Sequence, residues 1–134
     1  AEPTVIHSHA HWADTGIDMG MQIALAFPGE VMANIDCSFA APFRCRAELV
    51  GEQGRMMLED AFLPGDDPVL LLQRSTERDA IIEVERVPPT NQYTCEVTAF
   101  CESIATGRLL PPAENGLDNM RVLEQALAYA RQAR

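Results

Sequence analysis

Three histidines alternate with small residues near the start of the chain, at His7, His9 and His11. Alternate side chains of an extended strand point to one face, so the three imidazoles would lie together. Neighbouring imidazoles, with Cα atoms about 7 Å apart, could share a metal ion, whereas His7 and His11 would lie about 13 Å apart. We therefore interpret the row as a polar stripe on an exposed or interfacial sheet face. Metal binding by His7 and His9 stays open as an alternative.

Other chemistry-bearing motifs are missing from the sequence. It contains no Gly-x-Gly-x-x-Gly, and the fragment Gly51-x-x-Gly54 falls between two predicted strands rather than before a helix. No Gly-x-Ser-x-Gly elbow occurs. All ten basic residues are arginines, so no lysine can act as an acid, a base or a Schiff-base former. We expect this chain by itself to bind no nucleotide cofactor and to carry no catalytic residue.

The overall charge and the cysteines exclude several classes of protein. The formal net charge is -10, with 20 acidic residues against ten basic ones, which argues against binding nucleic acid or an anionic membrane. No apolar run approaches the roughly 20 residues that span a bilayer, and the start lacks a signal-peptide pattern. The four cysteines form no Cys-x-x-Cys pair. They are expected to be buried free thiols in a reducing cytoplasm.

The elements that would carry these residues are predicted strands in the first part of the chain and predicted helices in the last part. A period of two from Thr4 to about Val87 predicts consecutive strands joined by short turns. Their expected ranges are 4–12, 17–27, 31–39, 44–50, 55–59, 69–73 and 80–87. In the first range, Val5 is expected on the histidine face, and Ile6 with Ser8 on the other face.

Helical spacing replaces the strand pattern after Pro88-Pro89. Tyr93, Val97, Phe100 and Ile104 would share one helical face, with Gly107 as the terminal cap. A last helix after Pro111-Pro112 would bury Leu117, Met120, Leu123, Leu127 and Ala130. These patterns predict one α+β domain over residues 1–134. Its open-faced, mainly antiparallel sheet of about seven strands would have the two C-terminal helices packed on one face. The uncovered sheet face predicts a dimer or higher oligomer.

Several stretches resemble the glucose–fructose oxidoreductase/inositol dehydrogenase (Gfo/Idh/MocA) family. Residues 39–55 (FAAPFRCRAELVGEQGR) are similar to its strand pair ending in G-x-x-G. Asn91-Gln92-Tyr93 with Glu96 and Phe100 resembles its next helix, and residues 112–123 resemble its last one. Residues 15–18 and 27–29 are similar to the branch with dihydrodiol and xylose dehydrogenases. The resemblance covers nearly the whole chain, and its specificity comes from the order and spacing of loose motifs.

The resemblance implies that this chain is the C-terminal domain of a two-domain oxidoreductase. An N-terminal Rossmann domain of the parent would bind NAD or NADP, and this chain would shape the site for a sugar, polyol or related carbonyl compound and mediate oligomers. The family's catalytic lysine, in a Glu-Lys-Pro motif, would lie outside this chain. Phe43 matches a position where the family places an aromatic residue toward the substrate, with Phe39 and Arg44 nearby. Simple packing of Phe39 and Phe43 is the alternative interpretation.

Three hypotheses remain at this point. The chain is part of an oxidoreductase and supplies substrate-site walls and subunit contacts. Alternatively, it is a stand-alone dimerising or ligand-binding module without catalysis. In the third hypothesis it is a small metalloprotein built on His7, His9 and His11.

Overall fold

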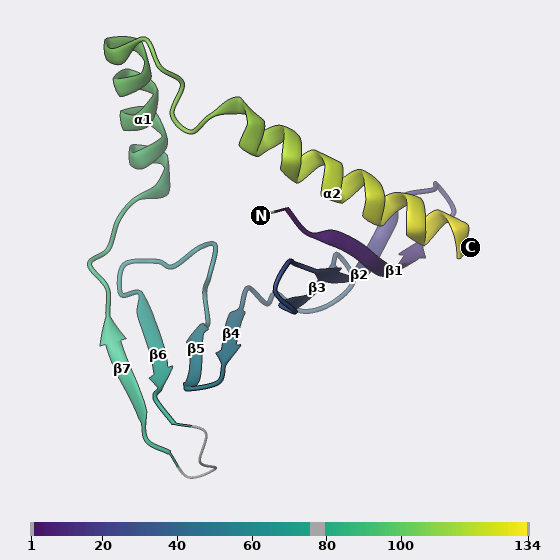
Figure 1. Ribbon diagram of the computed structural model, residues 1–134, viewed down its shortest axis with the longest axis horizontal. Helices are drawn as coiled ribbons and strands as arrows, with labels where there is room; N and C mark the ends of the chain where they lie inside the picture. Colours follow the sequence, from purple (N-terminus) through teal and green to yellow (C-terminus); the bar gives the residue numbers. More distant parts are fainter. Residues whose placement is uncertain (1, 76–79, 134) are drawn as a thin grey trace. The chain divides into compact units, whose positions relative to one another are not determined.

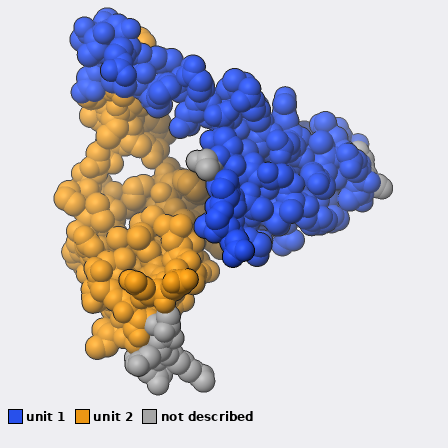
Figure 2. Space-filling model, viewed as in Figure 1, with its two compact units in different colours: residues 1–41, 102–134 blue, residues 42–101 orange. Residues whose placement is uncertain are grey.

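The chain folds into two compact units. The computed structural model describes residues 2–75 and 80–133. Residues 1–41 and 102–134 form one unit, which we call the terminal unit, and residues 42–101 form the other, the central unit (Figure 2).

The terminal unit is a three-stranded antiparallel sheet with one long helix (Figure 1). Its strands are β1 (Thr4–Trp12), β2 (Asp18–Ala26) and β3 (Met32–Ser38), in that spatial order. Gly16 and Gly29 supply the positive φ angles of +84° and +80° needed in the two turns. Helix α2 (Ala113–Gln132) packs along β1.

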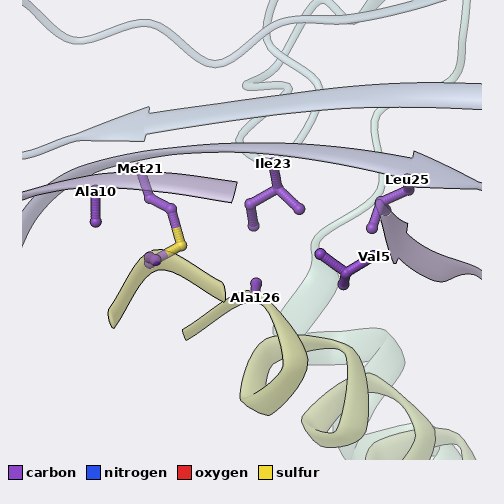
Figure 3. Packing of buried hydrophobic residues seen from close by; sticks show 7 residues of the cluster. Val5, Ala10, Met21, Ile23, Leu25 and Ala126 are labelled. Atoms are coloured by element: carbon purple, nitrogen blue, oxygen red, sulfur yellow. The ribbon is translucent and has the colours of Figure 1, made fainter. Parts of the chain in front are cut away.

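The core of this unit lies between the sheet and α2 (Figure 3). Alternate residues of the strands face Ala126 and Ala130, which are 0% and 2% exposed. The small alanine side chains let the helix backbone approach the sheet closely. Ser8, only 1% exposed, uses that proximity to donate a hydrogen bond from its Oγ to the carbonyl oxygen of Ala126. The buried apolar residues are Val5, Ala10, Met21, Ile23, Leu25, Ala126 and Ala130.

A bulge in β1 corrects the predicted sides of its first residues. Val5 pairs with Leu25 and His7 with Ala24, so Ile6 is an extra residue in the ladder. One extra residue reverses the alternation on the far side of the bulge. Val5 is therefore buried at 2% exposure, although the simple alternation placed it on the histidine face, and Ile6 is 49% exposed.

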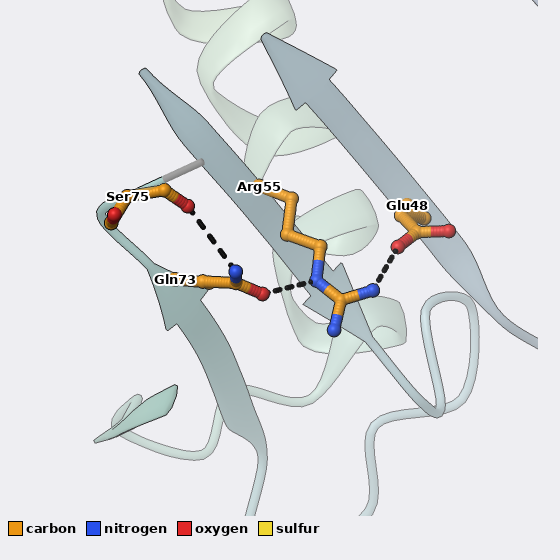
Figure 4. A network of polar contacts seen from close by, with 4 residues as sticks. All are labelled: Glu48, Arg55, Gln73 and Ser75. Atoms are coloured by element: carbon orange, nitrogen blue, oxygen red, sulfur yellow. Dashed lines mark hydrogen bonds and ion pairs between the residues drawn. The ribbon is translucent and has the colours of Figure 1, made fainter. Parts of the chain in front are cut away.

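The central unit holds a four-stranded antiparallel sheet. Its strands are β4 (Ala47–Gly51), β5 (Gly54–Leu58), β6 (Val69–Gln73) and β7 (Ile82–Arg86), in sequence order. Gly51 and Gly54 pair at the hairpin between β4 and β5. Arg55 ties three strands together, since it donates to Gln73 of β6 at 2.8 Å and pairs with Glu48 of β4 at 3.1 Å (Figure 4).

Helix α1 (Gln92–Thr106) follows β7 and crosses the boundary between the units. Asn91 caps it, since its Oδ1 accepts hydrogen bonds from the backbone N–H groups of Tyr93 and Thr94 at 3.0 and 3.1 Å. Gly107, with a φ of +65°, follows its last turn as expected. No residue of α1 is buried.

The predicted α+β class, with antiparallel strands followed by two helices, is confirmed. The sequence predicted one sheet of about seven strands, whereas the structure has two sheets. The strand ladder ends at Ser38 and resumes at Ala47, and the segment between them contains Pro42, which cannot donate a ladder hydrogen bond. Of the two helices in the described part of the chain, α2 buries residues and α1 does not. The predicted apolar face of α1 (Tyr93, Val97, Phe100 and Ile104) is 61–68% exposed.

The four cysteines are free thiols, but none is buried, which corrects the expectation from the sequence. Cys37 lies on β3, whereas α2 covers β1, and Cys95 and Cys101 lie on a helix without buried residues. Cys45 is half-buried.

Across the described residues, neither helix combines the length and the apolar character that a membrane span requires.

Candidate functional site

The histidine stripe lies on the exposed face of the three-stranded sheet, as predicted. His7, His9 and His11 are all exposed, and the ladder places His9 in one row with Gln22 and Asp36. The next row contains His7, Ala24 and Asn34. A shallow hollow of about 330 Å³ lies over these rows, lined by His7, Gln22, Ile23, Ala24, Asn34, Ile35 and Asp36. Imidazole, amide and carboxylate groups make it a hydrogen-bonding surface.

This face does not assemble a metal site among residues 2–75 and 80–133. No group of three His, Cys, Asp or Glu side chains there could hold an ion. His7 and His9 therefore lack the further ligand that a zinc or iron site needs. The metal-binding hypothesis is supported only by the placement of the His7 and His9 imidazoles on one face of β1.

The predicted substrate-facing residues are exposed and lie, along the chain, on either side of the point where the terminal unit passes into the central unit. Phe39 follows β3 in the terminal unit and is 82% exposed. Its backbone N–H still donates to the carbonyl oxygen of Met19 at 2.8 Å. Phe43, 78% exposed, and the exposed Arg44 begin the central unit. Neither phenylalanine belongs to the buried core of its own unit.

Cys45 anchors the segment that carries Phe43 and Arg44. Its carbonyl oxygen accepts a hydrogen bond from the Ala61 N–H at 2.8 Å, and its Sγ accepts one from the Phe62 N–H at 3.2 Å. Cys45 also forms a parallel bridge with Asp60. These contacts join Cys45 to residues 60–62, which follow β5.

Two further exposed residues lie at this anchor that the sequence did not single out. Phe62 is 73% exposed beside Cys45, and Arg46 follows Cys45 directly. The position of Phe62 depends on the contact between two loops, which no local pattern reveals. The only local signal for Arg46 is its place two residues after Arg44, which puts both on one side of an extended chain.

Some of the carboxylates are held in exposed ion pairs. The Arg86 guanidinium donates a hydrogen bond to Asp67, and this bond and its charge hold the pKa of the Asp67 carboxyl below its ordinary value of 3.8. Arg74 pairs with Glu83 at 3.1 Å.

A second hollow, of about 500 Å³, lies in the central unit between the loop after β5 and the start of α1. Leu63, Pro64, Gly65 and Asp66 line one side, and residues 89–93 the other. Two N–H groups of the first helical turn already bond to Asn91.

Comparison with known proteins gives one curated relative and a group of solved structures, while no family model matches the chain. The relative is dTDP-3,4-didehydro-2,6-dideoxy-alpha-D-glucose 3-reductase of Saccharopolyspora spinosa. It is 27% identical over 125 residues, which is 92% of this chain and 37% of the relative. The chain thus spans less than two-fifths of that protein's length.

Similar solved structures include KijD10, a 3-ketoreductase from Actinomadura kijaniata, in complex with TDP-benzene and NADP. The open conformation superposes with a TM-score of 0.74 at 22% identity, covering 94% of this chain and 38% of that one. A single-residue mutant of the same enzyme gives a TM-score of 0.78 at 21% identity, with 96% and 40% covered. The α+β fold of this chain is therefore shared with a part of KijD10.

Proposed function

We propose that this chain is the substrate-binding and assembly domain of a longer NADP-dependent oxidoreductase of the Gfo/Idh/MocA family. The supporting observation is that nearly all of the chain is similar to under half of two reductases. One is named as the 3-reductase of a dTDP-linked sugar, and the other, a 3-ketoreductase, is solved in complex with TDP-benzene and NADP. The proposed substrate is accordingly a keto sugar linked to a nucleoside diphosphate.

The names of these relatives favour nucleotide-linked keto sugars over dihydrodiols or xylose within the family. The narrower branch expected from residues 15–18 and 27–29 thus stays a prediction without support.

Reduction of a ketone adds a hydride to the carbonyl carbon and a proton to its oxygen. NADPH would supply the hydride when bound, and the glycine-rich turn that holds such a cofactor is missing from this sequence. The sequence has no lysine to supply the proton either. In the proposal, both therefore come from outside residues 1–134, and this chain binds and orients the substrate. Phe39, Phe43 and Arg44 are its proposed substrate-lining residues.

The first experiment is to read the coding sequence directly upstream of Ala1. The proposal expects a strand, a glycine-rich turn and a helix, followed by a lysine next to a proline. A start codon preceded by unrelated sequence would contradict it and would favour the stand-alone module.

Activity is then measured on the longer protein, by following NADPH oxidation with a dTDP-linked 3-keto sugar. Turnover that is much faster with NADPH than with NADH is the expected result. A longer protein that binds NADPH but reduces no keto sugar would refute the proposed substrate class.

A further inference from the structure

The central unit has no buried core within the described part of the chain. Among residues 42–75 and 80–101, no residue is buried. A sheet and a helix are normally stable because each buries an apolar face against another element. The apolar residues of this unit therefore need a covering element in addition to the ones described.

Helix α1 presents the clearest uncovered surface of this kind. Tyr93, Val97, Phe100 and Ile104 lie within about 60° of its circumference, since one helical turn takes 3.6 residues. All four side chains are 61–68% exposed, and we call them the α1 apolar face. Five of the 15 residues of the helix are β-branched, and helices of this length are marginal without tertiary contacts. We therefore expect another element to pack on this face.

The charge of α1 argues against a membrane as the covering surface. The helix has two glutamates, Glu96 and Glu102, and no basic residue. Helices that lie on membranes are usually rich in lysine and arginine on their polar side. The chain as a whole has a net charge of -10. A protein surface is therefore the expected partner.

The composition of the face and the lengths of the similar proteins favour cover by the same polypeptide. None of the four residues is charged, and interfaces that resemble a domain core are typical of permanent contacts. The chain spans only 37–40% of the curated relative and of KijD10. Over half of a protein of that length would thus lie outside residues 1–134. The polar sheet face with His7, His9 and His11 suits a contact with a second copy better.

We propose that the α1 apolar face is the surface on which the cofactor-binding part of the longer oxidoreductase docks. This inference rests on the proposed function, because the covering polypeptide is the part of that protein outside this chain. It assigns α1 to the contact between the two parts of one molecule, rather than to the substrate or to a second subunit.

Two cysteines of α1 can report whether the face is covered. Cys101 lies next to the face, about 40° from Val97, whereas Cys95 lies nearly opposite the face. Both are exposed free thiols in the structure. The experiment measures maleimide labelling of each cysteine by peptide mass spectrometry, in the 134-residue chain and in the longer protein, over a dilution series. In the longer protein, Cys101 should label at least tenfold more slowly than Cys95 at every concentration. In the 134-residue chain, the two rates should be similar.

A substitution in the face should remove this protection. Phe100→Glu in the longer protein should restore the labelling rate of Cys101, because burial of an unpaired carboxylate in an apolar contact is unfavourable. Thr98→Glu is the matched control, since Thr98 is exposed and lies away from the face. It should leave Cys101 protected. Circular dichroism checks that both variants are folded, and the comparison of the two cysteines in the unsubstituted protein does not depend on either variant.

Three results would overturn the proposal. Equal labelling of Cys95 and Cys101 in the longer protein would show that the face stays open. Slow labelling of Cys101 in the 134-residue chain would show that this chain covers the face itself. Protection that is lost on dilution would assign the face to a second copy.

These outcomes are separate from a failure of the proposed function. A longer protein with a protected Cys101 but without reductase activity would leave this inference standing. An active reductase in which Cys101 labels freely would do the reverse.

Discussion

Gly54 shows how closely single residues are fitted in the central sheet. A Cβ atom at this position would lie 1.9 Å from the carbonyl oxygen of Gln73, and the φ angle is +148°. The sequence marks Gly54 as a turn residue, but only the fold reveals that β6 runs against its missing side chain. The same holds for Ser8, whose polar side chain is buried because a helix carbonyl more than a hundred residues away accepts its hydrogen bond.

Replacing Gly54 by alanine should destabilise the central unit by about 2–4 kcal/mol, because the added methyl group forces β5 and β6 apart. Urea unfolding followed by far-UV circular dichroism measures the change. Gly116→Ala is the matched control, since nothing lies within 4 Å of a Cβ there and the residue is in α2. That variant should gain about 0.5–1 kcal/mol. Equal unfolding midpoints for both variants would contradict the clash.

At the scale of elements, the strand and helix ranges could be predicted from sequence because alternation and helical spacing are local signals. The range of β1 was predicted as Thr4–Trp12, and β6 as Val69–Gln73. Which residues each element buries was less predictable. Of the face predicted for α2, Ala130 is buried and Leu127 packs against the core, whereas Leu117 and Met120 are 51% and 54% exposed. Ala126, which is fully buried, was not among the predicted residues. Hydrophobicity ranks leucine first, whereas close packing against a sheet selects for small side chains.

Ala126→Leu should therefore weaken the attachment of α2 by about 1–3 kcal/mol, because no space exists for the larger side chain at a position with 0% exposure. Trp12 packs against the same core, so its fluorescence during thermal unfolding reports on this unit. Ala128→Leu, on the exposed side of the helix, should leave the transition unchanged. An unaltered transition in the Ala126 variant would show that the helix shifts to make room.

The candidate site was predictable only in part, because contacts between distant segments are not visible in local sequence patterns. Phe43 and Arg44 lie in a stretch with a family resemblance, so the sequence drew attention to them. Phe62 was identified only from the structure, in which its N–H donates a hydrogen bond to Cys45, 17 residues away in the sequence. Long-range contacts of this kind leave no periodic trace in a sequence.

For the whole molecule, no described element of the terminal unit covers the sheet face that carries His7, His9 and His11, since α2 packs on the opposite face. We predict that a second copy of the protein covers it, and that light scattering after size-exclusion chromatography gives a dimer or larger species. Ala24→Arg places a bulky charge at the centre of this face and should yield monomers. Ala128→Arg, on α2, serves as the control. Wild-type protein that stays monomeric at high concentration would exclude this interface.

The terminal unit is built from the two ends of the chain, and this determines when it can form during synthesis. The bond between Ser8 and Ala126 joins residues 118 positions apart, so the sheet emerges from the ribosome long before the helix that covers it. Until then, Val5, Ile23 and Leu25 face water. The central unit has all its strands in one continuous stretch and can fold during that interval. A nascent chain stalled before α2 would thus carry a folded central unit next to the uncovered sheet of β1, β2 and β3. The apolar face of that sheet would then be exposed and open to binding by a chaperone.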